Sequence, residues 1–465
     1  MELSALMLAR IQFAFTVAFH IIFPTFTIGL SAWIATLLVV WQRTGQERYR
    51  TLARFWTKIF AVSFAMGVVS GIVLSYQFGT NWSRFSEVVG NVVGPLIGYE
   101  VLTAFFLEAT FLGIMLFGWR RVPPWLHTLS AVLVAVGTLG SAFWIISANS
   151  WMQAPAGHEL RDGIAYPADW LAAIFNPTFP LRLIHMVAAA YLTTAFVVIA
   201  VGARYMLANR DLDHARTMLK MGLGMAVILA PAQLIIGDAH GLQALEYQPA
   251  KIAAVEAHWD GSKPGDLILF AWPDEAAETN HYEVAIPKGA SIILRRGADG
   301  LFQGLKDFPV EDRPPVLLPF FGFRLMVGLG LVMIAMAVWG VILWWRGTLE
   351  RSRLFLRLAS ISWPAGFVAI LAGWTVAEVG RQPWTVTGVL RTADSASPVV
   401  AGAVLATLIL FVLVYVVVFS GGILYINRMI NRGPGVEAPK EEEGVPSRPL
   451  SGAEASAREI FGTGG

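Results

Sequence analysis

Long apolar stretches dominate this chain and predict membrane-spanning helices. A helix rises 1.5 Å per residue, so about 20 apolar residues cross the hydrocarbon core of a bilayer. Nine stretches reach this length, and they lie near residues 12–41, 54–78, 94–118, 125–147, 183–206, 218–240, 317–345, 355–380 and 397–426. The pattern predicts an all-α integral membrane protein with about nine transmembrane helices.

Basic residues predict the orientation of these helices. Lys and Arg collect in the first, third, fifth and seventh connections, for example at Arg120 and Arg121 in the third. Cytoplasmic loops carry such an excess of Lys and Arg. We therefore expect the N-terminus outside and the C-terminus in the cytoplasm.

One long connection on the outer face divides the chain into four parts. We expect helices one to six over residues 1–246, an extramembrane loop over 247–316, helices seven to nine over 317–430, and a disordered cytoplasmic tail over 431–465, which is rich in Pro, Gly and Glu. Within the loop, residues 248–259 predict a short amphipathic helix, and residues 284–304 predict a strand and turn.

Composition limits the chemistry. The 465 residues are 56% hydrophobic and 14% charged, and they include no cysteine. Disulfides, iron–sulfur clusters and thiolate-ligated haem are thereby excluded. No basic run interleaved with aromatic residues predicts a nucleic-acid partner.

Titratable side chains inside the predicted helices are candidate functional residues, because they are costly in lipid. They are His20, Glu100, Glu108, His185 and Glu378. His20 is expected about eight residues, roughly 12 Å, from the outer end of its helix. His185 and Glu378 are expected in the same outer half of the membrane.

Met326 is expected at a similar level, and it changes the chemical picture. Imidazole and thioether are axial ligands of haem iron, and a His/Met pair suits electron transfer. An iron held on one side only would leave a site for oxygen. Copper is a poorer fit, because the other histidines lie at helix ends or in loops. The simpler alternatives are an interhelical hydrogen bond for His20 and core packing for Met326.

Two carboxyls in one predicted helix indicate a polar path that could relay protons. Glu100 and Glu108 are eight residues apart, which is about 80° around a regular helix. Ser141 and Asn149 have the same spacing in the next helix. Buried carboxyls are suited to relaying protons. The alternative is that both carboxyls are structural partners of basic groups.

Several long motifs, in order, resemble subunit I of cytochrome bd-type quinol oxidases over the chain up to about residue 430. They are ARIQFAFTVAFHIIFPTFTIGL, GVVSGIVLSYQFGTNWSRF, GYEVLTAFFLEATFLG, SANSWMQ, FRLMVGLG and GWTVAEVGRQPWTVTGVLRT. The short outer loop resembles the cyanide-insensitive branch. The resemblance implies a respiratory terminal oxidase of the bacterial cytoplasmic (inner) membrane. It also implies a second membrane subunit and, in many members, a small single-span subunit, with quinol and O2 as substrates.

The resemblance also implies haem ligands. His185 and Met326 match the axial ligands of a low-spin haem b, and Arg324 matches a cation beside that haem. His20 and Glu378 match the axial ligands of the two active-site haems. These are a high-spin haem b and a haem d, or a further haem b in the cyanide-insensitive branch, and which residue holds which haem stays open.

Further roles are implied near these ligands. The family places a proton route at Ser141 and Asn149 and quinol oxidation at Lys251 and Glu256. A hydroquinone must lose two protons, so a carboxylate with a nearby cation is chemically sensible. The alternative for Lys251 and Glu256 is a solvated helix face.

The residues themselves add three expectations. Trp374 lies four residues before Glu378, so both share one helix face. Arg381 follows one turn later, where it could pair with haem propionates. Pro24, four residues after His20, cannot donate a hydrogen bond to the His20 carbonyl and predicts a kink.

Two other functional classes remain at this point. One is a cytochrome b-like relay that carries electrons without an oxygen site. The other is a proton-coupled transporter that has no cofactor and uses the carboxyls alone. Haem bands in an optical spectrum would separate these from a quinol oxidase.

Overall fold

The computed structural model describes residues 4–261, 264–301 and 303–435. Within them, eight helices are long and apolar enough to cross a membrane, and a bent pair makes a ninth. The eight are α1 (Ala5–Thr44), α2 (Glu47–Thr80), the continuous run of α3 (Ser83–Tyr99), η1 (Glu100–Phe105) and α4 (Phe106–Phe117), α5 (Pro124–Gln153), α7 (Phe179–Leu207), α8 (Leu212–Tyr247), α11 (Leu317–Trp345) and α14 (Ala401–Arg432). The predicted helical membrane fold is confirmed. Of the predicted tail, residues 436–465 lie outside the described part.

The ninth span is broken. It consists of α12 (Arg353–Ile361) and α13 (Pro364–Val379), which meet at an angle of 42°. Pro364 stands in the first turn of α13, a position that a proline tolerates because its missing N–H has no helical partner there. The sequence predicted one unbroken helix over 355–380, so only its position was predicted correctly.

The helices extend beyond the apolar stretches. In α1, Ser4 caps the first turn by accepting a hydrogen bond from the Met7 N–H at 3.2 Å. His20 therefore lies 15 residues from the start of α1 at Ala5, about 22 Å at the helical rise. The predicted span began at residue 12, so His20 lies farther from the end of its helix than predicted, whereas its depth in the membrane stays a prediction.

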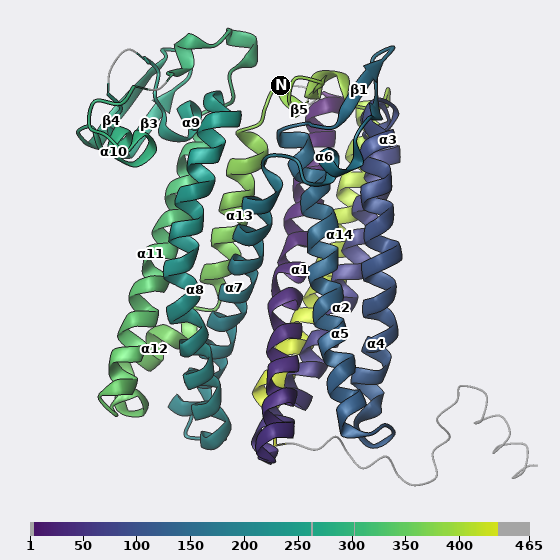
Figure 1. Cartoon of the computed structure of the whole chain (residues 1–465), viewed down its shortest axis with the longest axis vertical. Coiled ribbons are helices and arrows are strands. Elements are labelled where there is room, and N and C mark those ends of the chain that lie inside the picture. Colours follow the sequence, from purple (N-terminus) through teal and green to yellow (C-terminus); the bar gives the residue numbers. More distant parts are fainter. Residues whose placement is uncertain (1–3, 262–263, 302, 436–465) are drawn as a thin grey trace, which may run out of the picture.

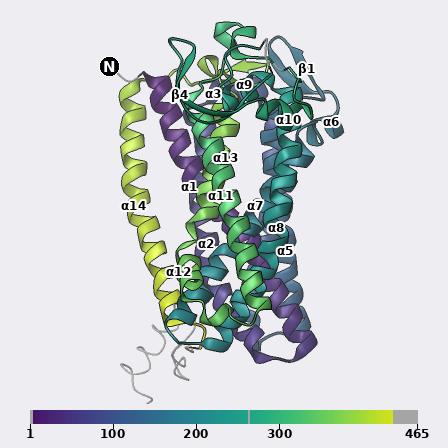
Figure 2. The same cartoon turned by 90° about the vertical axis from the view of Figure 1, so that its left-hand side faces the viewer.

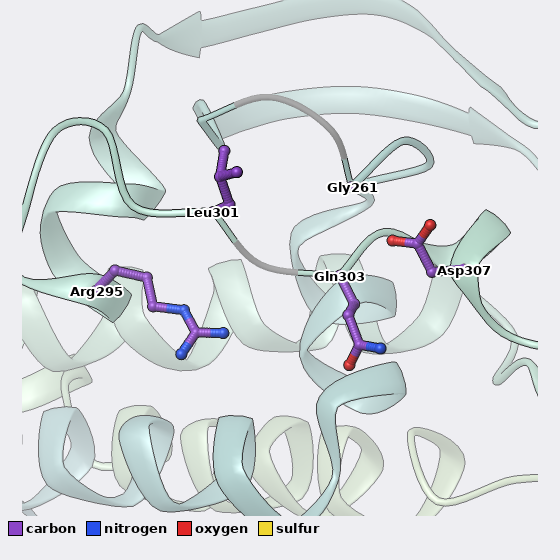
Figure 3. A pocket seen from close by; sticks show the side chains of 5 residues that line it. All are labelled: Gly261, Arg295, Leu301, Gln303 and Asp307. Atoms are coloured by element: carbon purple, nitrogen blue, oxygen red, sulfur yellow. The ribbon is translucent and has the colours of Figure 1, made fainter.

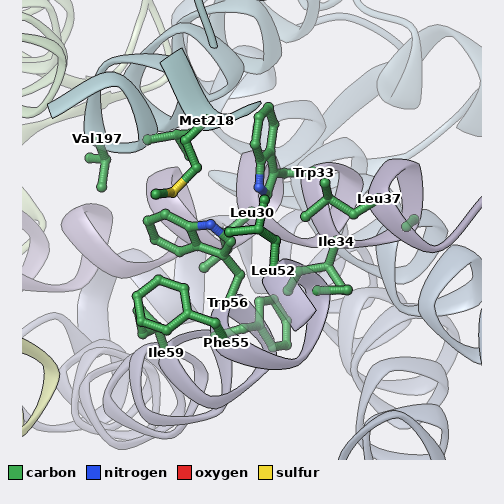
Figure 4. Close-up of a cluster of buried hydrophobic side chains, with 14 of the residues drawn as sticks. Leu30, Trp33, Ile34, Leu37, Leu52, Phe55, Trp56, Ile59, Val197 and Met218 are labelled. Atoms are coloured by element: carbon green, nitrogen blue, oxygen red, sulfur yellow. The ribbon is translucent and has the colours of Figure 1, made fainter. Parts of the chain in front are cut away.

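The helices form two groups (Figure 1). One contains α1 to α5 and α14, and the other contains α7, α8 and α11 to α13, while α7 packs against α1 between them. A buried core joins the groups, with Trp33 of α1 and Trp56 of α2 close to Met218 of α8 (Figure 4). Figure 2 shows α14 at one margin of the bundle.

All described strands lie at one end of the bundle, which we call the loop end (Figure 1). They form three antiparallel pairs: β1 (His158–Arg161) with β2 (Ile164–Pro167), β3 (Leu267–Asp274) with β4 (Thr279–Ile286), and β5 (Trp384–Val386) with β6 (Leu390–Arg391). The short helices α6 (Trp170–Ile174), α9 (Pro249–Glu256) and α10 (Gly289–Arg295) lie there too. The connections after α1, α4, α7 and α11 lie at the opposite, basic end. Which end faces the cytoplasm stays a prediction.

Two predictions for the long loop need correction. The predicted helix exists as α9, but it is not amphipathic, because every residue from Lys251 to Glu256 is buried. The segment 284–304 is not mainly strand and turn, since β4 ends at Ile286 and α10 follows. A short apolar run such as the one in α10 is compatible with either state, and periodicity alone does not decide between them.

Candidate functional site

Glu378 is the centre of a buried polar cluster at the loop end. Asn149 of α5 donates to the Glu378 Oε1 atom at 3.0 Å, and Arg381 forms an ion pair with Oε2. Arg182 of α7 donates to the Asn149 Oδ1 atom at 2.5 Å and to Ser150 at 3.0 Å. Helices α5, α7 and α13 therefore meet around one carboxylate.

The cluster contains more positive than negative charge. Arg182, Lys251 and Arg381 are 9%, 7% and 6% exposed, and the carboxylate that joins their hydrogen-bond network is Glu378. Within the described residues, Nε and Nη1 of Arg381 are buried without a hydrogen-bond partner. Unpaired buried charge is costly. The site therefore suits a further anionic group, and the carboxylates of haem propionates have the required chemistry.

His20 has the hydrogen bonding expected of an iron ligand. Its Nδ1 atom lies 3.0 Å from the Ser70 Oγ atom. That hydroxyl has backbone acceptors at Met66 and Gly67, at 3.1 and 3.0 Å. With the hydroxyl proton directed to one of these carbonyls, Ser70 accepts from Nδ1–H and leaves the Nε2 lone pair available. The interhelical hydrogen bond and iron ligation are thus compatible, because they use different nitrogens.

His185 and Met326 lie in the second group of helices, and glycines lie against both side chains. A Cβ atom at Gly237 of α8 would be 3.3 Å from the His185 Cε1 atom. A Cβ atom at Gly373 of α13 would be 2.6 Å from the Met326 sulfur. The two side chains are thus placed by helices α8 and α13, both of which pack in the same half of the bundle.

Gln233 of α8 positions His185. Its amide donates to the His185 carbonyl at 3.0 Å and approaches Nδ1 at 3.3 Å, while its Oε1 atom has no partner in the described residues. The opposite amide orientation would let Nδ1–H donate to Oε1, as ligation through Nε2 requires, but it would also put Oε1 against the His185 carbonyl oxygen and lose that hydrogen bond.

Glu100 and Glu108 both face α5. Glu100 is hydrogen-bonded to Ser141, and a Cβ atom at Gly137 would be 2.6 Å from the Glu108 side chain. Gly137 and Ser141 are four residues apart, so the two carboxyls lie against one stripe of α5. The predicted angle of about 80° does not apply, because η1 is a π-helical turn that interrupts the regular helix.

Ser141 and Asn149 have different partners. Ser141 belongs to the carboxyl pair, whereas Asn149 belongs to the Glu378 cluster. Eight residues of α5 separate them, about 12 Å at the helical rise.

Lys251 and Glu256 are buried on the same short helix but have different partners. Lys251 donates to the side-chain oxygens of Gln153 and Gln248, at 2.6 Å each. Glu256 pairs with Arg324 of α11 at 3.3 Å. The cation beside Glu256 is therefore Arg324, and the interpretation as a solvated helix face is wrong.

Burial shifts the pKa of both groups. It lowers the pKa of Lys251 well below its usual value, and Arg182 and Arg381 add to this effect by repulsion. Burial raises the pKa of Glu256, while Arg324 opposes the rise. Burial thus disfavours the charged form of both side chains.

Arg324 connects the loop to α11. Its guanidinium donates to the Val255 carbonyl at 2.6 Å and to the Ile268 carbonyl, by Nε at 2.9 Å. Arg324 thus holds α9 and β3 against the helix that carries Met326. Its bonds in the described residues are to this loop and to its own helix.

Other residues of the site were not predicted from the sequence. Arg182 lies three residues before His185, and the cost of charge inside a membrane would have identified it. Gln153, Ser70 and Gln233 carry no such signal, because neutral polar residues are common in membrane helices. Trp374, which was predicted, is half-buried one turn before Glu378 in α13.

A hollow in the long loop lies apart from these residues. Gly261, Arg295, Leu301, Gln303 and Asp307 line it (Figure 3). None of the predicted site residues is in this lining.

Comparison with known proteins gives one consistent family. The family model for cytochrome bd terminal oxidase subunit I matches residues 8–434. Cytochrome bd ubiquinol oxidase subunit 1 of Bacillus subtilis (strain 168) is 37% identical over 444 residues, which cover 93% of this chain and 94% of the relative. Cytochrome bd-II ubiquinol oxidase subunit 1 of Escherichia coli (strain K12) is 30% identical, covering 94% and 99% of the two chains.

A solved structure agrees in fold. The bd oxidase from Geobacillus thermodenitrificans matches with a TM-score of 0.86 and 33% identity, covering 93% of this chain and 99% of that one. The family model, which matches residues 8–434, includes every helix that contributes to the Glu378 cluster. The chain belongs to the cytochrome bd terminal oxidase subunit I family.

Proposed function

We propose that this chain is the quinol-oxidising and oxygen-reducing subunit of a respiratory terminal oxidase in the bacterial inner membrane. The observation that carries the proposal is the Glu378 cluster, in which three buried basic side chains share one hydrogen-bond network with a single carboxylate. A family match over nearly the whole chain supports it. A transporter without a cofactor would leave this excess of positive charge unbalanced.

The proposed haem ligands are those implied by the resemblance. His185 and Met326 hold the low-spin haem b, and His20 and Glu378 hold the two active-site haems, a high-spin haem b and a haem d or a further haem b. When bound, the haems supply one-electron transfer and an iron that binds oxygen. Arg182 and Arg381 provide the positive charge for propionates near Glu378.

Quinol oxidation is proposed at α9. Glu256 accepts a proton from the hydroquinone, and its raised pKa makes it a better base at neutral pH than an ordinary glutamate. Arg324 keeps this carboxylate next to α11. Arg324, which pairs with the proton acceptor Glu256, therefore lies two residues before the proposed ligand Met326 in α11.

The proton path is proposed along α5. The part nearer the basic end consists of Glu108, beside Gly137, and Glu100, which is bonded to Ser141. Nearer the loop end, Asn149 donates a hydrogen bond to Glu378. Side chains alone do not close the distance of about 12 Å between Ser141 and Asn149. Ordered water is required there to carry protons.

The partner proposed first is the second membrane subunit, since the relatives are named as subunit 1 of bd oxidases. A small single-span subunit is a further proposed partner. Placement of the loop end outside the cell and membership of the cyanide-insensitive branch stay predictions from the sequence.

An optical spectrum of the purified oxidase, combined with pyridine haemochrome analysis, tests the proposal. We expect both low-spin and high-spin haem signals. Low-spin signals alone would support a cytochrome b-like relay, and no haem signals would support the transporter. Oxygen uptake with quinol as the only reductant must accompany the spectrum of an oxidase.

A further inference from the structure

Gln153 is the last residue of α5, and both the oxygen and the nitrogen of its side-chain amide form hydrogen bonds. It is 2% exposed. Its Oε1 atom accepts from the Lys251 ammonium at 2.6 Å and from the Gln248 amide at 2.9 Å. Its Nε2 atom donates to the Glu378 Oε1 atom and to the Ala377 carbonyl, at 3.4 Å each.

We infer that Gln153 is a positioning residue that couples the Lys251 site on the extramembrane loop to Glu378 in the membrane. A primary amide suits this place because it is neutral, accepts at one end and donates at the other. Its oxygen faces a cation and its NH2 group faces a carboxylate. The opposite orientation would put NH2 against the ammonium, so the two charged neighbours fix the amide.

A second contact links Lys251 to the backbone next to Glu378. A Cβ atom at Gly380 would be 2.9 Å from the Lys251 Cγ atom. The lysine stem therefore lies on the backbone turn that follows Glu378. A change in the position of Lys251, for example when a substrate contacts it, acts on Gln153 and on this turn together.

Gln248 provides a matched control. Its side chain contacts Lys251, Gln153 and Thr387. Unlike Gln153, it has no hydrogen bond to Glu378 among the described residues. Gln153→Met and Gln248→Met both remove an acceptor from Lys251, but only the former removes a donor from Glu378.

The inference rests on the proposed function, in which Lys251 serves quinol oxidation and Glu378 is a haem ligand. Both variants should raise the KM for quinol, by about tenfold for the loss of one charge-assisted hydrogen bond. Only Gln153→Met should also lower the midpoint potential of one high-spin haem. A carboxylate that loses a hydrogen-bond donor becomes a stronger ligand and favours ferric iron.

The test is a spectroelectrochemical titration of the complete oxidase together with quinol kinetics. An unchanged low-spin band shows that each variant is folded. The coupling is refuted if Gln153→Met leaves all midpoint potentials at wild-type values, or if Gln248→Met shifts them equally. Glu378→Gln tests the proposed function separately: if all haem bands persist in it, the ligand assignment fails, whereas the comparison of Gln153→Met with Gln248→Met still decides the coupling.

Discussion

Gly373 on α13 lies directly against the thioether sulfur of Met326 on α11. A Cβ atom at Gly373 would be 2.6 Å from Sδ, a distance that real Cβ atoms essentially never show. The absence of a side chain on α13 therefore allows the sulfur to take its position. Since Met is a flexible apolar side chain, close contact with the α13 backbone at Gly373 restricts the orientation of Met326.

Gly373→Ala should disturb the proposed low-spin haem. The added methyl group must displace the Met326 sulfur, and a displaced thioether weakens or loses its bond to iron. We expect a reduced or broadened low-spin band in the difference spectrum. Gly328→Ala on α11 is the matched control, because a Cβ atom there would have no neighbouring atom of the described residues within 4 Å. Equal spectra for both variants would argue against Met326 as a ligand.

Gly137→Ala should slow proton delivery while all haem bands remain. Its methyl group would be 2.6 Å from the Glu108 Cγ atom, so the carboxyl must move. Gly140→Ala, one turn away, makes an ordinary contact of 3.5 Å with Ala104. We expect oxygen uptake to fall about tenfold or more in the first variant only, in line with the contribution of a positioned proton-transfer group. Normal turnover of Gly137→Ala would exclude Glu108 from the path.

The pH dependence of quinol oxidation should report Glu256. The carboxyl must be deprotonated to accept a proton, and burial raises its pKa. Activity is therefore lost as pH falls through this raised pKa, so the acidic limb of kcat/KM should lie above the ordinary glutamate value of about 4.3. Arg324→Gln removes the cation that opposes the rise and should move the limb to higher pH.

Lys288→Gln is a suitable control for that profile. Lys288 is half-exposed and pairs with Asp299 on the loop surface, apart from Glu256. It should leave the acidic limb unchanged. An acidic limb at the ordinary value in the wild type, or one that Arg324→Gln does not move, would contradict the role of Glu256.

Arg182→Gln should weaken haem retention. The variant removes one of the two buried arginines near Glu378, so the proposed propionates lose a positively charged partner. We expect the haem bands to bleach at a lower temperature and the haem content per protein to fall. Arg161→Gln changes an exposed ion pair with Glu159, which should matter little. If Arg182→Gln retains full haem content and heat resistance, the excess positive charge serves another purpose.

Sequence patterns predicted the helices better than their ends. The hydropathy of each span is a property of many residues, so the positions of all nine were evident. The first turns of α1 contain Arg10 and were left out of the predicted span, although capping by Ser4 begins the helix there. The π-helical turn at Glu100 and the break before Pro364 depend on tertiary packing, which residue periodicity does not describe.

The candidate residues were predicted better than their partners. A titratable group in an apolar segment is conspicuous, and for that reason Glu378 and His20 were found. Their hydrogen-bond partners come from distant parts of the chain, such as Asn149 for Glu378 and Ser70 for His20. Lys251 and Glu256 were expected to act together, but they are five residues apart on α9 and so point to different helices.

The bend in the ninth span has a mechanical consequence for Glu378. Helix α13 has 16 residues, about 24 Å of rise, which is less than the roughly 30 Å of hydrocarbon. The helix that carries the carboxylate is thus too short to cross the hydrocarbon alone, and the chain bends at Ser362, which donates to the Ala359 carbonyl and accepts from the Ala365 N–H. The opposite end of α13 is held by Gln153 and Arg381 through their contacts with Glu378, so the two ends of this short helix are fixed by different parts of the chain.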